Sequence, residues 1–265
     1  MTALSERSAR VVQAAKLHRR AQRSASGRFL AEGPNLIEAA SRVGALEEVF
    51  ATESAAQRHH RILTGLTVSI VTDKAMKSLS ETVTPVGLVG VCTCPEADLG
   101  AIVAAEPGLI VVGVEIADPG NAGTLIRLAD AMGADAVVFT GDVVDPYNGK
   151  CVRSSAGSIF TVPVAVEADT AGLIHRLRTG GIGVLATTLT GELSLDDADG
   201  LLSAPTAWIF GREAHGLPEE IAARADHRVR IPMSRGVDSL NVAVAAAICL
   251  YQSARAQRLS VRRLT

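Results

Sequence analysis

The sequence has few aromatic residues and no long apolar run. Tryptophan, tyrosine and phenylalanine together make up only 3% of the 265 residues, whereas 48% of the residues are hydrophobic. A chain rich in aliphatic rather than aromatic residues is typical of a parallel β-sheet covered by helices on both faces. No apolar run approaches the roughly 20 residues that a membrane span needs. The N-terminus has arginines and no signal-peptide core. We therefore expect a cytoplasmic protein with no membrane partner.

Metal, disulfide and common nucleotide signatures are also missing. Cys92, Cys94, Cys151 and Cys249 form no C-x-x-C pair, so we expect reduced thiols and no bound metal. No Walker loop, H-E-x-x-H or G-x-S-x-G motif occurs. The segment 118–123 lies where a dinucleotide fingerprint would stand, but its glycines have the wrong spacing. Hydrolases and ordinary Rossmann enzymes therefore have little support.

Basic residues gather at the two ends of a chain whose net charge is only −2. Such ends predict a polyanion that binds particular surfaces rather than the whole protein. On charge alone, two solvated helical faces explain the same pattern. The basic residues are Arg7, Arg10, Lys16, Arg19, Arg20, Arg23 and Arg28 at the front, and Arg255, Arg258, Arg262 and Arg263 at the back.

Strand and helix signals alternate and divide the chain into two α/β domains. A basic helix over residues 4–26 opens the first domain, which ends near residue 93. Pro, Gly and acidic residues mark 94–107 as a linker. The second domain, 108–265, begins with a buried strand at 109–114 and continues with strands and helices in alternation. This order predicts a largely parallel sheet flanked by helices, preceded by a small α/β domain.

Two successive strand-to-helix junctions lie in the last fifth of the chain. The first follows the strand 207–210 at Gly211, and the second follows the strand 229–231. Asp238 and Ser239 are expected to cap the long helix after it. Ligands of parallel α/β sheets usually bind at the carboxyl ends of strands. The sequence therefore predicts a ligand site at these junctions.

Polar residues near these strand ends have a structural and a functional interpretation. Asn121, Thr124 and Arg127 recur every three residues on the helix after Gly120. By periodicity alone Arg127 is a solvated surface residue, and Asn121 is an N-cap or turn residue. Glu213 is equally a first-turn carboxylate, and Ser239 equally a cap. Spacing does not decide between these interpretations.

Three motifs in a fixed order resemble those of a known family, and this resemblance favours the functional interpretation. They are N-A-G-T-L-I-R at 121–127, F-G-R-E-A-H-G-L at 210–217 and I-P-M-S-R-G-V-D-S-L-N-V-A-V-A-A-A at 231–247. Together they resemble the three ordered motifs of the SpoU (TrmH) family of RNA 2′-O-ribose methyltransferases, of the SPOUT class. Residues 29–91 resemble the small RNA-binding domain, related in fold to ribosomal protein L30e, that often precedes this catalytic domain.

The resemblance implies a fold, a cofactor and a set of site residues. The C-terminal segment would pass through a loop to form a trefoil knot, which is rare among proteins, and S-adenosylmethionine would bind in it. Cofactor contacts would come from Gly211, Ile231, Leu240 and either Thr187 or Thr188. Arg127 would be the catalytic arginine. Its polar neighbours would be Asn121, Glu213, Ser239 and Asn241.

The implied substrate is RNA. The basic residues Arg19, Arg20, Arg23 and Arg28 and the L30e-like domain suit structured RNA, in which phosphates and 2′-hydroxyls are contacted. Arg153 would hold the target nucleotide or its phosphate. Large-subunit (23S) ribosomal RNA is the favoured substrate, because members with this front domain mostly act on it, and transfer RNA is the alternative. One branch of the family confers resistance to a thiopeptide antibiotic, and the chain is a candidate for it.

The resemblance also implies a homodimer, packed through the small residues Ala243, Ala246 and Ala247 of the last helix. Two rival functions stay open. A non-catalytic RNA-binding or ribosome-assembly protein would keep the knot as a scaffold and would not bind S-adenosylmethionine. A nicotinamide oxidoreductase would need the dinucleotide fingerprint that the chain lacks.

Overall fold

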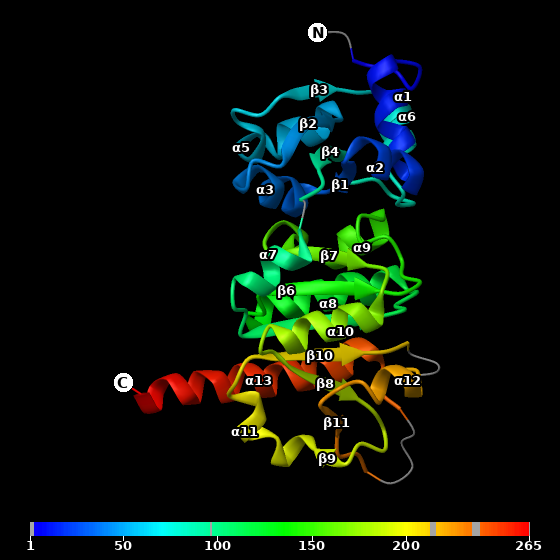
Figure 1. Cartoon of the computed structure of the whole chain (residues 1–265). Coiled ribbons are helices and arrows are strands. Elements are labelled where there is room, and N and C mark those ends of the chain that lie inside the picture. Colours follow the sequence, from blue (N-terminus) through cyan, green and yellow to red (C-terminus); the bar gives the residue numbers. More distant parts are fainter. Residues whose placement is uncertain (1–2, 96, 213–215, 235–238, 265) are drawn as a thin grey trace. The chain divides into compact units, whose positions relative to one another are not determined.

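The computed structural model describes residues 3–95, 97–212, 216–234 and 239–264. They form two compact units (Figure 1). Unit 1 runs up to Pro95 and includes residues 145–161, and unit 2 comprises the rest. This grouping differs from the predicted domains, because 145–161 packs with the front of the chain. The predicted linker also holds a helix of unit 2, α7 (Leu99–Ala104).

A seven-stranded sheet forms the centre of unit 2. Its strand order is β7-β6-β5-β10-β8-β11-β9, and every neighbouring pair is parallel. The predicted fold class, a parallel sheet flanked by helices beside a small α/β domain, is thereby confirmed. The strands are β5 (Leu109–Val114), β6 (Ala136–Thr140), β7 (Val164–Glu167), β8 (Gly183–Thr187), β9 (Leu193–Ser194), β10 (Thr206–Phe210) and β11 (His227–Arg230).

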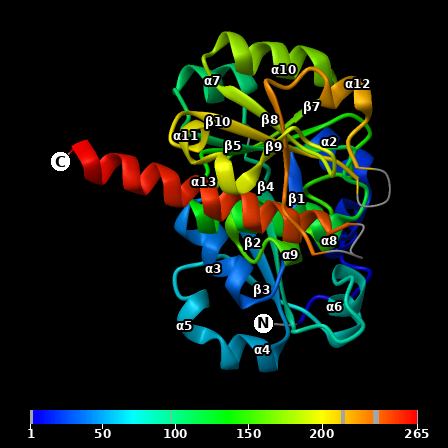
Figure 2. The same cartoon turned by 90° about the horizontal axis from the view of Figure 1, so that it is seen from below.

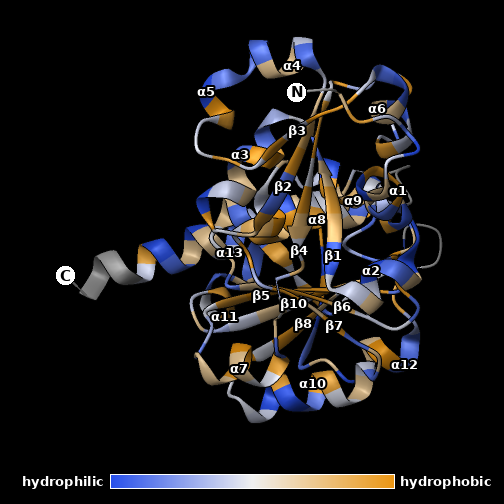
Figure 3. Cartoon of the chain, turned by 90° about the horizontal axis from the view of Figure 1, so that it is seen from above, coloured by the Kyte–Doolittle hydropathy of each residue, from blue (hydrophilic) through white to orange (hydrophobic). Residues whose placement is uncertain are grey.

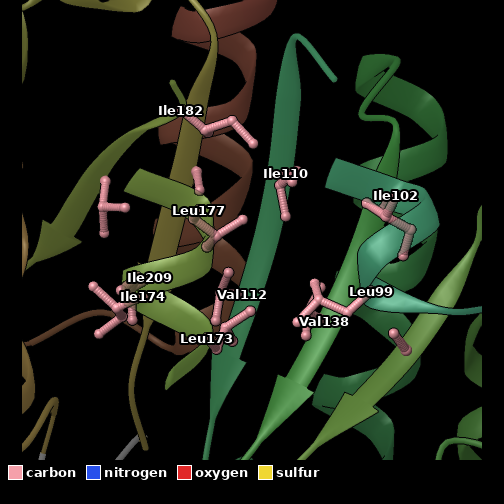
Figure 4. Close-up of a cluster of buried hydrophobic side chains, with 14 of the residues drawn as sticks. Leu99, Ile102, Ile110, Val112, Val138, Leu173, Ile174, Leu177, Ile182 and Ile209 are labelled. Carbon is pink, nitrogen blue, oxygen red and sulfur yellow. The ribbon is translucent and has the colours of Figure 1, made fainter. Parts of the chain in front are cut away.

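Helices cover both faces of this sheet. On one face α7 and α10 (Thr170–Thr179) pack side chains such as Leu99, Leu173 and Leu177 against β5, β6, β8 and β10 (Figure 4). On the other face lie α8 (Pro119–Met132) and α13 (Val242–Leu264), with α11 (Asp199–Leu202) beside α13. The central strands carry the hydrophobic colours in Figure 3, whereas α10 shows hydrophilic and hydrophobic positions side by side. Burial of aliphatic side chains on both faces drives the formation of this layered unit.

The C-terminal helix α13 is fixed to the sheet by polar as well as apolar contacts. It runs beside α8 (Figure 2), and its residues Ala243 and Ala246 are buried. The indole N–H of Trp208, which is fully buried in β10, donates to the Ser253 hydroxyl at 2.8 Å. The Gln257 amide donates to the Gly108 carbonyl at 2.8 Å. These bonds fix the second half of α13 to unit 2.

Unit 1 is built on a four-stranded mixed sheet of order β1-β4-β2-β3, in which only β2 and β3 are parallel. Helices pack on its two faces in two separate apolar clusters. The strands are β1 (Arg28–Glu32), β2 (Leu46–Ala51), β3 (Val68–Ile70) and β4 (Leu88–Thr93). The helices that follow β1, β2 and β3 are α3 (Pro34–Arg42), α4 (Glu53–Arg58), α5 (His60–Leu63) and α6 (Asp73–Leu79).

The predicted basic helix over residues 4–26 is broken in the structure. Instead α1 (Ala9–Ala15), the 3₁₀ turn η1 (Lys16–His18) and α2 (Arg20–Ser26) follow one another, with an extended backbone at Arg19. Breaking a helix leaves carbonyl groups without intrahelical partners. The guanidinium of Arg23 supplies them, because its Nη1 donates to the carbonyls of Leu17 and His18 at 2.8 Å each. The break is thus stabilised by a side chain from the following helix.

The segment 145–161 joins unit 1 through an ion pair and a group of rings. It contains α9 (Gly149–Ser154) and the turn η2 (Ser158–Phe160). Asp145 accepts from the buried Arg23 at 2.6 Å. The Phe29 ring lies 5.0 Å from that of Tyr147 and 5.6 Å from that of Phe160. The sequence interpretation missed this grouping, since contacts between distant segments decide it.

No helix among the described residues is both long and apolar enough to cross a bilayer. The structure shows no disulfide among the described residues, and Cys92, Cys151 and Cys249 are buried. Burial raises the pKa of the half-buried Cys94 thiol to about 11. Such thiols remain protonated at neutral pH and are poor nucleophiles.

Replacing Ser253 by alanine tests how α13 is held. Ser253→Ala leaves the buried Trp208 N–H without a partner, and we expect a loss of about 1–3 kcal/mol in the free energy of unfolding. Urea denaturation followed by fluorescence of this only tryptophan measures the loss. The control is Ser203→Ala, whose hydroxyl is exposed. Equal stabilities for the two variants would contradict the anchoring role of Ser253.

Candidate functional site

A cavity of about 590 Å³ lies in unit 2 where β8, β10 and β11 end. This volume is within the usual range for small-molecule sites. Three chain segments line it, each following one of the strands, so the site lies at the carboxyl edge of the sheet as the sequence predicts. The lining residues include Thr187, Thr188 and Leu189 after β8, Gly211, Gly216 and Leu217 after β10, and Ile231, Met233, Ser239 and Leu240 after β11.

Gly211 allows the chain to fold back on itself at the carboxyl end of β10. Its residue is buried, and a Cβ atom built on it would collide with the backbone of Gly216 and Leu217. The Gly216 N–H donates to the Arg212 carbonyl at 2.9 Å and closes the turn. Only glycine fits such an approach of backbone to backbone. The cavity wall on this side is therefore largely main chain.

The two threonines at the end of β8 differ in what their hydroxyls do. The Thr187 hydroxyl donates to the Ile209 carbonyl at 3.0 Å. The Thr188 hydroxyl is buried and has no hydrogen-bond partner among the described residues. A buried polar atom without a partner is costly and suits a site that awaits a ligand. Of the two threonines that the sequence leaves open, Thr188 is the one with a hydroxyl available to a cofactor.

Asn121 and Asn241 meet beside the helix starts of α8 and α13. The Asn241 amide donates to the Asn121 side-chain oxygen at 3.3 Å. The Asn241 oxygen accepts from the N–H groups of Ala243 and Val244, at 2.9 and 3.4 Å, and so caps α13. Helix α13 begins only at Val242, so Asn241 and not the predicted Ser239 is its cap; the other predicted cap, Asp238, lies outside the described residues. The N-cap of α8 is Asp118.

Arg127 lies on α8, on an exposed turn of the helix. Its guanidinium forms no ion pair or hydrogen bond with the residues that the structure describes. Arg127 does not line the cavity, and neither do Asn121 and Asn241. The structure therefore brings together the predicted cofactor contacts, and it separately pairs two of the predicted catalytic residues. Arg127 remains available for an anion outside the cavity.

Glu213 and Ser239 are the two remaining residues predicted to act at the site. Glu213 lies outside the described residues. Ser239 is exposed and lines the cavity. In the described part of the chain no three His, Cys, Asp or Glu side chains gather as ligands for a metal ion.

The basic residues predicted to bind RNA lie in unit 1 and have unequal surroundings. Arg19 and Arg20 are exposed, and Arg28 is exposed but paired with Glu47 at 3.1 Å. Arg23 is only 5% exposed and is saturated by Asp145 and two carbonyls. Its assignment to RNA binding was wrong, because a buried and paired guanidinium cannot reach a phosphate.

Arg153 on α9 is held by carboxylates of unit 1. Its Nη1 lies 3.4 Å from Glu81 and 3.6 Å from Glu32, whose side chain is 7% exposed. Glu81 also pairs with His18 at 3.3 Å. The hydrogen bond from His18 lowers the pKa of Glu81, and the same bond raises the pKa of His18. Arg153 would have to leave these partners to bind a nucleotide.

The sequence interpretation missed one interaction at the site. Glu115, directly after β5, forms an ion pair with Arg212, directly after β10, with 3.1 Å between Oε2 and Nε. Both positions belong to the predicted strand-end segments. Their pairing depends on the neighbourhood of β5 and β10 in the sheet, and sequence order does not reveal it.

Two family models match the chain. The SpoU rRNA Methylase family matches residues 108–251. The MRM3-like substrate binding domain matches residues 8–90. The first match covers the parallel sheet of unit 2 and the three strand-end segments that line the cavity. Its range also includes residues 145–161, which belong to unit 1.

Known proteins similar to the chain include curated sequences and solved structures. A 23S rRNA (guanosine(2553)-2′-O)-methyltransferase of Bacillus subtilis is 33% identical over 89% of this chain and 92% of its own length. A 23S rRNA (uridine(2479)-2′-O)-methyltransferase of Streptomyces viridochromogenes is 34% identical over 75% and 70%. The structure of the SpoU methyltransferase AviRb of S. viridochromogenes in complex with the cofactor AdoMet matches with a TM-score of 0.85 and 30% identity. The match covers 96% of this chain and 99% of that one.

A methyl group at position 211 tests the cavity wall. Gly211→Ala forces the backbone of Gly216 and Leu217 away, and we expect S-adenosylmethionine affinity to fall by about tenfold or more. Isothermal titration calorimetry measures the affinity. The control is Gly200→Ala, since a Cβ there meets nothing within 4 Å. Unchanged affinity in Gly211→Ala would contradict the proposed wall.

Thr188 and Thr187 give opposite expectations when each is replaced by valine. Thr188→Val removes a buried hydroxyl without a partner, so the cofactor-free protein should unfold at the same or a higher temperature while its affinity for S-adenosylmethionine falls about tenfold. Thr187→Val breaks the bond to Ile209 and should lower the melting temperature instead. Calorimetry and thermal denaturation measure the two effects. An unaltered affinity in Thr188→Val would rule out a contact from its hydroxyl.

Proposed function

The chain belongs to the SpoU rRNA methylase family, and on this basis we propose that it transfers the methyl group of S-adenosylmethionine to a ribose 2′-hydroxyl of RNA. The observation that carries the proposal is the cavity at the strand ends. The three predicted cofactor contacts, Gly211, Ile231 and Leu240, come from separate segments and line this one space.

The residues present fit S-adenosylmethionine. The wall at Gly211 and Gly216 offers main-chain groups at close range, and Thr188 offers an unpaired hydroxyl. Leu189, Leu217 and Met233 add apolar surface for a ring or a thioether chain. When bound, the cofactor supplies a methyl group already activated by a sulfonium. Catalysis then rests on making the hydroxyl nucleophilic and aligning it.

Arg127 would act on the RNA side of the reaction. A guanidinium does not lose its proton in proteins, so it cannot be the base. Because Arg127 is exposed and unpaired among the described residues, it can hold a phosphate and stabilise the developing alkoxide. A phosphate oxygen, Glu213 or water would accept the proton. Asn121, Asn241 and Ser239 would lie near the acceptor ribose.

Large-subunit ribosomal RNA is the proposed substrate. The relatives from B. subtilis and S. viridochromogenes bear names that specify 23S rRNA, one for a guanosine and one for a uridine. The two names differ in nucleotide and position, so relatives do not identify the nucleotide for this chain. The thiopeptide-resistance branch and a transfer RNA substrate stay secondary hypotheses. A ribosomal substrate also supports a cytoplasmic location.

We further propose the trefoil knot that the family resemblance implies. Two features of unit 2 support it. The segment after β11 returns to the cavity through Ile231, Ser239 and Leu240, beside the turn after Gly211. It then continues into α13, which is fixed against α8 and β10.

The family resemblance also implies a homodimer, and the structure suggests which surface would form it. Of the three predicted contact residues, Ala243 and Ala246 are buried within the unit itself and are excluded, whereas Ala247 is partly exposed. The opposite face of α13 exposes Val244, Ile248 and Tyr251 at helical spacing, with exposed fractions of 49%, 38% and 53%. An apolar stripe of this kind is a candidate for subunit packing.

Arg127→Ala is the mutation that tests the chemistry. We expect the rate of methyl transfer to fall by about 100-fold or more, with affinity for S-adenosylmethionine within about twofold of wild type. Transfer of a tritiated methyl group to unmodified 23S rRNA measures the rate. Alkaline hydrolysis then identifies 2′-O-methylation, because the phosphodiester next to a methylated 2′-hydroxyl resists alkali. The control is Arg176→Ala, an arginine of α10 paired only loosely with Glu167 at 3.7 Å.

Three results would contradict the proposal in distinct ways. Release of the label in mononucleotides by alkali would mean that a base, and not a ribose 2′-hydroxyl, was methylated. Binding of RNA without binding of S-adenosylmethionine would favour the non-catalytic ribosome-assembly protein. Near wild-type turnover in Arg127→Ala would remove this arginine from the mechanism.

The dimer is tested with a charge on the exposed stripe. We expect wild type to sediment as a dimer and Ile248→Glu to sediment as a monomer, because the carboxylate would be buried without a partner. The control is Val12→Glu, at a comparably exposed valine of α1 (42%). A monomeric wild type would contradict the dimer, and a dimeric Ile248→Glu would contradict the surface.

A further inference from the structure

Glu115 and Arg212, to which the family resemblance assigns no role, connect the segment that leads into α8 with the segment that lines the cavity. Glu115 follows the last residue of β5, and Arg212 follows Gly211 at the end of β10. The strands are neighbours in the sheet, with Phe210 opposite Gly113. The Arg212 Nε lies 3.1 Å from the Glu115 Oε2. The ion pair thus spans the carboxyl ends of two adjacent strands.

The backbone of Glu115 is held in an unusual conformation. Its φ is +53°, in the left-handed region that residues other than glycine rarely adopt. Its N–H donates to the Thr140 carbonyl at 2.9 Å, which continues the pairing of β5 with β6. Gly141 lies so close that a Cβ there would be 2.9 Å from the Glu115 Cγ. Such a conformation persists only where the surroundings hold it, and it marks sites where geometry matters.

Each partner begins a segment with a role in the proposed reaction. Three residues after Glu115, Asp118 caps α8, the helix that carries Asn121 and Arg127. Arg212 begins the turn that Gly216 closes, on the wall of the cofactor cavity. An ion pair of this exposure, 40% and 33%, contributes little to stability. Its position suits the setting of a distance rather than the strengthening of the fold.

We propose that Glu115 and Arg212 form a positioning pair that aligns the helix of Arg127 with the methyl-donor pocket. The inference rests on the proposed function, because it concerns the geometry of that reaction. Neither residue touches the reacting atoms. Their effect should therefore appear in the rate of transfer, since an in-line displacement is sensitive to small displacements of its partners.

The test uses Glu115→Gln, Arg212→Gln and the double variant in the full chain. We expect each single change to lower kcat by about tenfold or more, and the double change to lower it no further than the larger single effect. In Glu115→Gln, whose side chain does not line the cavity, affinity for S-adenosylmethionine should stay within about twofold, and in both single variants the melting temperature should stay within about 2 °C. The control is Arg178→Gln, which breaks a similar Nε–carboxylate pair with Asp226 (2.8 Å) on α10 and should keep wild-type kcat.

Amide hydrogen exchange gives a second measurement that does not depend on methyl transfer. In Glu115→Gln, exchange should accelerate both at the amides of Asn121 and Ala122, which bond to Asp118, and at that of Gly216, which bonds to the Arg212 carbonyl. Unchanged exchange, a wild-type kcat or an additive double variant would overturn the pair. Absence of methyl transfer in the wild type would overturn the proposed function alone, because exchange would still test the pair.

Discussion

The site depends on one close approach of backbone to backbone at the end of β10. This strand lies between β5 and β8 in the sheet, so the chain that leaves it can reach the ends of both neighbours. At Gly211 the absence of a side chain lets the turn through Gly216 and Leu217 fold directly over the strand end. The cavity, its main-chain wall and the placement of Arg212 follow from this turn. Glycine is required there by packing rather than by flexibility.

The proposed role of each segment depends on the strand that it follows. The segments after β8, β10 and β11 line the cavity and suit the methyl donor. The segment after β5 carries Asn121 and Arg127 and suits the RNA. Two interactions join them, the amide contact of Asn241 with Asn121 and the ion pair of Arg212 with Glu115. In-line transfer needs donor and acceptor to be held together, and these two contacts contribute to that alignment.

Sequence predicted the features that local pattern or a motif carries. Alternating strand and helix signals gave the parallel sheet, and the motifs led to Gly211, Ile231 and Leu240, which line one cavity. Features decided by tertiary contacts were missed. Charge could not reveal that Arg23 is buried against Asp145, and residue size could not reveal that Ala243 and Ala246 face inward. The grouping of 145–161 with unit 1 and the Glu115–Arg212 pair need the packed fold, since their partners are far apart in sequence.

Hydrogen exchange with and without S-adenosylmethionine tests the central claim most directly. If three strand-end segments hold the cofactor largely through main-chain groups, its addition should protect amides that line the cavity in each of them: those of residues 187–190, those of Gly211, Arg212, Gly216 and Leu217, and those of Ile231, Met233, Ser239 and Leu240. Amides of β1 to β4, in unit 1, should exchange at the same rate with and without the cofactor. Protection confined to other segments, or no protection at saturating cofactor, would contradict the assignment of this cavity to the methyl donor.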